Sequence, residues 1–106
     1  MKTNETLQQL AETIEQRKSA KADESYVASL YGAGLEKILD KISEEANETV
    51  AAAREEVPRH LIHEVADLWF HCMVLLAHKG LSHEDVLAEL GNRFGTSGLV
   101  EKAQRN

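Results

Sequence analysis

Residues 61 to 77, LIHEVADLWFHCMVLLA, form the segment that most restricts how this chain can fold. Apolar side chains take up most of its helical circumference, which predicts a central helix that is buried on nearly all sides. One polar stripe interrupts the apolar surface and consists of His60, Glu64, Asp67, His71 and His78. Carboxylates without partners are costly to bury, so any fold of this chain must provide partners for Glu64 and Asp67.

Composition limits the size and setting of the protein. The 106 residues are 42% hydrophobic, enough for one domain over residues 1–106 with a thin core. The formal charge of −6 disfavours binding to nucleic acid or to anionic membranes. The N-terminus has no signal-peptide core, and the longest apolar run is broken by polar residues. The single cysteine, Cys72, cannot form an internal disulfide, so we expect a soluble cytoplasmic protein.

Hydrophobic periodicity and capping signals predict an all-α fold of four to five helices. The expected helices span about residues 4–17, 26–31, 35–56, 61–77 and 82–93. Ser25 and Ser82 can cap the second and last of them, and Asp85 completes a capping box with Ser82. Pro58 suits a first helical turn, and Gly80 suits the end of the apolar helix. No β pattern or internal repeat competes with this prediction.

The long helix expected over 35–56 carries a second acidic group, EEANE at 44–48. Glu44, Glu45 and Glu48 share one face, which we expect to lie away from the deepest apolar stripe. That stripe consists of Leu35, Ile38, Leu39, Ile42, Ala46, Val50 and Ala53. A solvated surface with ion pairs to Lys41 is the simplest interpretation. It fits poorly, because lysine placed before glutamate is the weaker helical orientation and because Glu64 stays unexplained.

A divalent cation would satisfy both acidic groups at once. Glu45 and Glu48 are spaced i, i+3, as are Glu64 and Asp67, and a turn at Pro58 can bring the two pairs together by antiparallel packing. An all-oxygen ligand set suits Mg²⁺ or Mn²⁺. Because Mg²⁺ prefers to share the phosphates of a substrate, several carboxylates facing one groove indicate a phosphate substrate.

Other metal sites fit the sequence less well. A di-iron bundle needs Glu-x-x-His on paired helices, but Asp67 and Phe70 occupy the positions where histidine would stand. No pair of cysteines is present for structural zinc. Among the histidines at 60, 63, 71 and 78, only His71 is expected near the groove, either in a functional role or as a hydrogen-bonded core residue.

Both acidic segments, with the residues around them, resemble a known family. EEANE at 44–48 followed by EVAD at 64–67 is similar to the EExxE…ExxD signature of the all-α nucleotide pyrophosphatase, or MazG-like, superfamily. Three longer stretches resemble the phosphoribosyl-ATP pyrophosphatase family within it: SYVASLYGAGLEKILDKISEEANETV, LIHEVADLWFHCMVLLAHKGLSHEDVLAEL and RFGTSGLVEKAQR. One departure is Ser43, where relatives often carry glycine; because serine is small, it casts little doubt on the site.

This resemblance implies a MazG-like helical bundle completed by homodimerisation. It also implies Mg²⁺-dependent hydrolysis of phosphoribosyl-ATP to phosphoribosyl-AMP and pyrophosphate in histidine biosynthesis. Carried over by position, Glu45, Glu48, Glu64 and Asp67 become metal ligands. Glu44 becomes a supporting carboxylate, and either Glu48 or Glu44 is the candidate general base.

Basic residues near the acidic segments are candidates for phosphate contact. The resemblance gives this role to Lys37 and Lys41, which share a helix face with the acids. Arg17, Lys18 and Lys21 either contact substrate phosphates or belong to a solvated loop.

An apolar helix among only four or five cannot be covered by its own chain, so a partner subunit is expected. Phe94, Leu99 and Val100 either dock that partner or pack locally. Two other functions stay open at this point. One is a housekeeping (d)NTP pyrophosphatase with the same acidic site, and the other is a non-catalytic helical dimerisation module.

Overall fold

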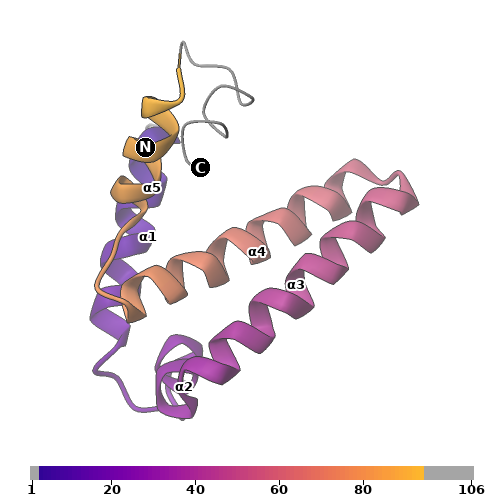
Figure 1. The fold of residues 1–106 in the computed structure, drawn as a ribbon. Coiled ribbons are helices and arrows are strands. Elements are labelled where there is room, and N and C mark those ends of the chain that lie inside the picture. Colours follow the sequence, from indigo (N-terminus) through magenta and orange to yellow (C-terminus); the bar gives the residue numbers. More distant parts are fainter. Residues whose placement is uncertain (1–2, 95–106) are drawn as a thin grey trace.

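The computed structural model describes residues 3–94, and all regular structure in this range is helical. Figure 1 shows the five helices in chain order. They are α1 (Thr3–Arg17), α2 (Tyr26–Ala33), α3 (Leu35–Glu55), α4 (Pro58–His78) and α5 (His83–Asn92). The predicted all-α class is confirmed, and the predicted ranges differ from these bounds only at helix ends. Leu99 and Val100 lie outside the described residues.

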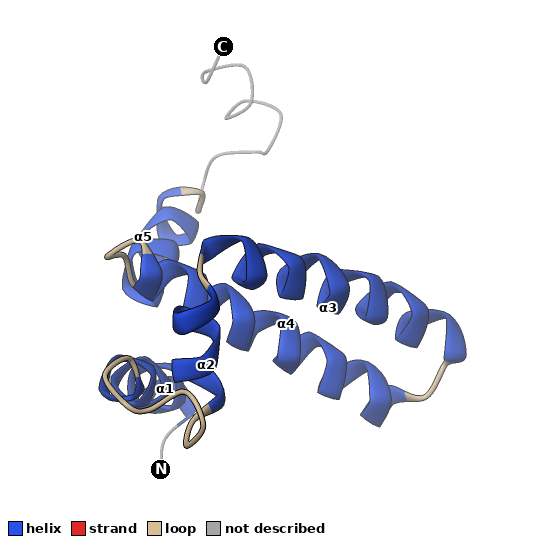
Figure 2. Cartoon of the chain, turned by 90° about the horizontal axis from the view of Figure 1, so that it is seen from below, coloured by secondary structure: helices blue, strands red, loops and turns tan. Residues whose placement is uncertain are grey.

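The two longest helices form an antiparallel arm. α3 and α4 have 21 residues each and pack against one another along their length. Figures 1 and 2 show this pair extending away from α1, α2 and α5, which gather around the C-terminal end of α4. The radius of gyration is 15.9 Å, whereas a compact domain of this length has about 13 Å. The arm therefore projects from the rest of the chain.

Local signals explain where the helices begin and end. The Ser25 hydroxyl accepts a hydrogen bond from the Ala28 amide at 3.2 Å, and Ser82 forms the predicted capping box with Asp85. Gly80 has a φ of 73° and ends α4, where the Leu81 amide donates to the Leu76 carbonyl at 2.8 Å. This hydrogen bond belongs to the Schellman motif, which favours glycine because an L side chain is strained at positive φ.

A small apolar core lies where α1, α2, α3 and the C-terminal half of α4 meet. Its buried members are Ile14, Val27, Leu30, Ile38, Met73 and Val74. Tyr31 of α2 also packs against this core and donates a hydrogen bond from its hydroxyl to the Val74 carbonyl at 2.9 Å. The base of the arm is thereby fixed to the other helices.

The expectation that residues 61–77 form a helix buried on nearly all sides is wrong for the single chain. Ile62 is 69% exposed and Trp69 is 59% exposed. On α3, Leu39 and Val50 of the predicted apolar stripe are exposed as well. The reason is that, among the described helices, only α3 follows α4 along the arm, while the others cover its C-terminal end. None of the described helices is long and apolar enough to cross a membrane.

Glu56, in the turn between α3 and α4, provides a test of this account of helix termination. It has a φ of 59°, the left-handed region where an L side chain costs about 1–2 kcal/mol. We expect Glu56→Gly to raise the free energy of unfolding by about 1 kcal/mol, because glycine avoids the strain. Urea denaturation measures this change. Glu56→Ala keeps the Cβ atom and serves as the control; an equal gain in both variants would contradict the argument.

Candidate active site

Glu45 occupies a core position of α3. Ile38 and Ala52, seven residues before and after it, are both 0% exposed, and Glu45 itself is 6% exposed. Residues seven apart share one helix face, so Glu45 faces α4. The expectation that Glu45 lies away from the buried stripe is therefore wrong. The repeat of Ile38, Glu45 and Ala52 sets the contact with α4, and Ile38 is the one buried member of the wider apolar stripe of α3.

Glu64 and His71 hold the matching positions on α4. They are also seven residues apart, and both are buried. The Thr49 hydroxyl of α3 lies 2.8 Å from the Glu45 carbonyl oxygen and 3.3 Å from the Glu64 carbonyl oxygen. This side chain links the two helices at the level of the two buried glutamates. Sequence reasoning missed Thr49, whose role depends on the register of the helix pair.

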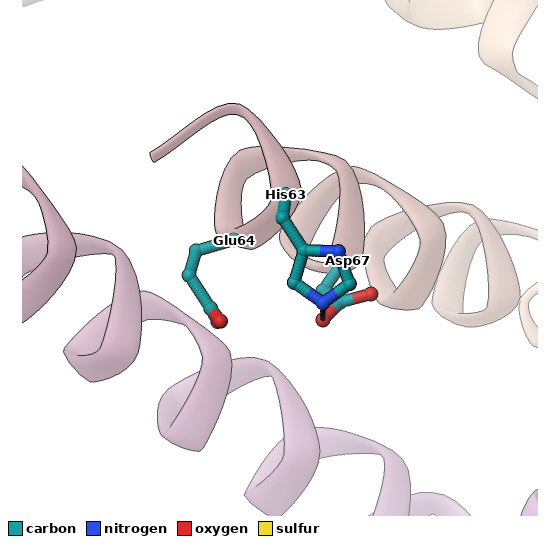
Figure 3. A group of neighbouring side chains, drawn as sticks. All are labelled: His63, Glu64 and Asp67. Carbon is teal, nitrogen blue, oxygen red and sulfur yellow. Dashed lines mark ion pairs between the residues drawn. The ribbon is translucent and has the colours of Figure 1, made fainter. Parts of the chain in front are cut away.

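The structure gathers the four predicted metal ligands into two overlapping groups. One group consists of Glu45, Glu48 and Glu64. In both groups each residue offers one ligand atom, and these atoms lie within 4.8 Å of one another. The second group adds Asp67 and His63 to Glu64, and Figure 3 shows these three side chains on one side of α4. We call Glu45, Glu48, Glu64 and Asp67 the acidic cluster.

Glu44 belongs to neither group. Its carboxylate is 54% exposed and forms an ion pair with Lys41 at 3.3 Å. Lys41 also lies 3.7 Å from Glu45. The pairing that the helical orientation disfavoured therefore does form, on the edge of the acidic cluster. The contact of Lys41 with Glu45 Oε1 leaves Oε2 of Glu45 without a partner.

Two oxygen atoms of the acidic cluster are buried without a hydrogen-bond partner. They are Oε2 of Glu45 and Oε2 of Glu64. Burial raises the pKa of both carboxyl groups, and the neighbouring Glu48 raises them further. Burying unpaired carboxylates of this kind costs folding free energy, and one divalent cation can be bound by several of them at once. The residues present therefore fit a Mg²⁺ or Mn²⁺ ion.

Tyr26 and His71 lie beside the acidic cluster. The Nδ1 atom of His71 is 2.7 Å from the Asp67 carbonyl oxygen, which can only accept, so Nδ1 carries the proton. The Nε2 atom lies 2.7 Å from the Tyr26 hydroxyl, and in the neutral ring it accepts a hydrogen bond from that hydroxyl. This chain of hydrogen bonds joins α2 to the Asp67 turn of α4. Sequence reasoning missed Tyr26, because only the tertiary structure brings α2 to this place.

The expectation that His71 is the only histidine near the site is wrong. His63 Nε2 lies 3.4 Å from Asp67 Oδ2, and His60 Nε2 lies 3.5 Å from Glu64 Oε1. The Nδ1 atom of His60 also contacts Glu55 at 2.6 Å. Both histidines stand four residues before a carboxylate, a spacing that is visible in the sequence and brings side chains together on a helix.

The structure separates the predicted phosphate-binding residues. Lys37 lies on α3 about one turn before Lys41 and is exposed. The Lys18 ammonium donates to the Ala77 carbonyl at 2.8 Å and pairs with Glu15 at 3.2 Å. Ala77 is about 20 Å further along α4 than Glu64, so Lys18 is not brought to the acidic cluster of its own chain. Arg17, at the end of α1, and Lys21, in the loop after it, are exposed.

α3 and α4 form an antiparallel helical pair with carboxylates facing across its seam, as the two acidic segments of the sequence predicted. The profile of the family described as phosphoribosyl-ATP pyrophosphohydrolase matches residues 7–94. The chain therefore belongs to the phosphoribosyl-ATP pyrophosphohydrolase family, which confirms the resemblance found in the sequence.

Relatives named phosphoribosyl-ATP pyrophosphatase match almost the whole chain. The protein of Methylococcus capsulatus is 59% identical over 101 residues, covering 95% of this chain and 96% of the relative. That of Neisseria meningitidis serogroup B is 57% identical over 99 residues, covering 93% and 92%. That of Ruthia magnifica is 52% identical over 103 residues, covering 97% and 98%.

The raised carboxyl pKa values predict how stability depends on pH and on cations. A carboxyl group whose pKa is raised binds its proton more tightly in the folded chain than in the unfolded chain. Its contribution to stability in EDTA therefore falls as the pH rises from the ordinary value of 4.5 through the raised value. At pH 7 in EDTA, Glu64→Gln should melt at or above the wild-type temperature, because the amide carries no charge.

Cations should reverse this order. At a Mg²⁺ concentration about 100-fold above Kd, the wild-type melting temperature should rise on the order of 10 °C, and that of Glu64→Gln should rise much less. Differential scanning fluorimetry measures both series. A variant that melts below wild type in EDTA and keeps the full Mg²⁺ shift would show that Glu64 is a structural residue outside any cation site.

Proposed function

We propose that this chain hydrolyses the α,β-phosphoanhydride of phosphoribosyl-ATP to phosphoribosyl-AMP and pyrophosphate. This reaction is the second step of histidine biosynthesis, and we place it in the cytoplasm, with Mg²⁺ as cofactor and Mn²⁺ as a substitute. One domain over residues 1–106 carries it. The observation that supports the proposal is the acidic cluster with its two buried, unpartnered oxygen atoms, in a chain of the phosphoribosyl-ATP pyrophosphohydrolase family.

Within the acidic cluster the residues have different tasks. A bound cation supplies neutralisation of the charge on the departing pyrophosphate. Three carboxylates would supply oxygen ligands in fixed positions: Glu45 and Glu64, which are buried in the helical seam, and Asp67, which is partly buried. Glu48 is the exposed member of its group, so water and substrate can reach it.

Glu48 is accordingly our candidate for the general base. It takes a proton from a water molecule, the water oxygen bonds to the α-phosphorus, and the bond from the α-phosphorus to the bridging oxygen breaks in line. The pyrophosphate leaves with the bridging oxygen. Glu44 is less suited to this task because it pairs with Lys41 outside both groups. Lys41 and Lys37 are the candidates for contact with the substrate phosphates.

We also infer that two copies of this chain form a homodimer through the exposed apolar surface of α4 and α5. An apolar cavity of about 290 Å³ opens there. Its lining consists of Leu7, Trp69, Cys72, Met73, Leu76, His83, Val86, Leu87 and Leu90. With the exposed Ile62 of the arm, these residues form a contiguous apolar surface, whereas a monomer usually exposes apolar residues singly. A second copy would supply the cover that the single chain lacks.

Pyrophosphate release by the purified protein with Mg²⁺ tests the reaction and the substrate together. We expect release from phosphoribosyl-ATP and little from ATP or dUTP. Glu48→Gln should lower kcat by at least about 100-fold, as expected for loss of a general base, and Glu44→Gln should lower it by less than about tenfold.

Three results would contradict this proposal. Preference for ATP or dUTP would make the protein a housekeeping nucleotide pyrophosphatase that uses the same acidic cluster. No release from any nucleotide would favour the non-catalytic dimerisation module, against which the buried, unpartnered carboxylates argue. Equal losses in the two variants would remove the distinction drawn between Glu48 and Glu44.

Light scattering tests the dimer. The wild-type protein should have twice the chain mass of 11.8 kDa. Trp69→Glu should give monomers at micromolar concentration, because it places a charge in the proposed apolar interface, and because Trp69 is 59% exposed the single chain should tolerate the change. Gln16→Glu, an exposed charge change on α1, is the control. A monomeric wild-type protein, or a dimeric Trp69→Glu variant, would contradict the assignment.

A further inference from the structure

His63 extends from α4 toward the acidic cluster. Its Nε2 atom lies 3.4 Å from Asp67 Oδ2, and the ligand atoms of His63, Glu64 and Asp67 all lie within 4.8 Å of one another. Figure 3 shows the imidazole edge directed at the Asp67 carboxylate, with the Glu64 carboxylate on the same side of the helix. Nothing in the reaction proposed above uses this histidine.

The spacing of these three atoms is close to that of ligands around one cation. Ligands bonded at about 2.1 Å in octahedral geometry lie about 3 to 4.2 Å apart. The group is close to this range, so small side-chain rotations would complete it. His63 is free to make them, since its side chain is 68% exposed and it sits on a regular helix.

Glu64, whose unpartnered oxygen also supports the all-oxygen group, is the buried member of this group. It is 8% exposed, and its Oε2 atom is buried without a hydrogen-bond partner. Glu64 belongs both to this group and to the all-oxygen group with Glu45 and Glu48. Its carboxylate therefore lies between two neighbouring positions that could hold cations, and only one of these positions has a nitrogen ligand.

We propose that His63, Glu64 and Asp67 bind a divalent cation of the first transition row, such as Mn²⁺ or Zn²⁺, through the Nε2 atom of His63, beside the all-oxygen group. Imidazole nitrogen suits first-row transition metals, whereas Mg²⁺ prefers oxygen. The chain thereby discriminates between cations at its two positions. This cation site shares Glu64 and Asp67 with the acidic cluster of the proposed function, but cation binding there does not require the proposed reaction.

The competing explanation is an ordinary helical ion pair between His63 and Asp67, four residues apart. Such a pair places no nitrogen on a metal. The two explanations therefore differ in a spectroscopic property of the bound ion, which can be measured without turnover.

Pulsed electron paramagnetic resonance of bound Mn²⁺ tests the proposal. We expect nitrogen-14 modulation in the wild-type protein, its loss in His63→Gln, and its retention in His60→Gln. His60 is the matched control, because it lies on the same helix near Glu64 but outside the group of three. Titration should show Mn²⁺ binding to His63→Gln weakened at least about tenfold. Mg²⁺ binding should change less than Mn²⁺ binding, because Mg²⁺ prefers oxygen ligands.

Two kinds of outcome would overturn the proposal. Bound Mn²⁺ without nitrogen modulation would exclude His63 as a ligand and leave the oxygen ligands standing. Modulation that persists in His63→Gln, or disappears in His60→Gln, would assign the nitrogen to another histidine. Failure of the pyrophosphate assay alongside clear His63-dependent modulation would refute the proposed reaction and leave this cation site in place.

Discussion

Burial of two carboxylates across the seam between α3 and α4 is the constraint on which the rest of the structure depends. Glu45 stands between Ile38 and Ala52, and Glu64 faces it from α4 with an oxygen that has no partner. Charge in such a place is destabilising unless it is compensated. The helix pair therefore must be held by other interactions, among them the Thr49 bridge and the apolar core at its base.

Much of the fold could be predicted because its signals are local. Ser25, Ser82 and Gly80 mark helix ends through hydrogen bonds to residues a few positions away. The four carboxylates of the acidic cluster could also be named, since their i, i+3 spacing and the family signature are both present in the sequence. The direction of Glu45 could not be obtained from the broad apolar stripe, because the narrower repeat of buried residues seven apart decides which face meets α4.

The missed residues have two physical causes. Tyr26 reaches His71 only because α2 folds back on α4, which no helical period encodes. His60 and His63 could have been found, since each precedes a carboxylate by four residues. The prediction placed His71 near the groove instead, one turn beyond Asp67, but its ring is occupied on both sides by hydrogen bonds. A histidine one helical turn from a carboxylate can therefore have both ring nitrogens already hydrogen-bonded, as His71 does.

The projecting arm has a consequence for how the protein behaves on dilution. α3 and α4 are joined to the other helices near one end. In the far half of the arm, which contains Glu48 and Glu64, each of the two helices has the other as its neighbour among the described residues. Two helices alone bury little apolar area and open readily. If a second copy covers this half, order around the acidic cluster follows mass action. Specific activity would then decline with protein concentration even where every residue of the acidic cluster is intact.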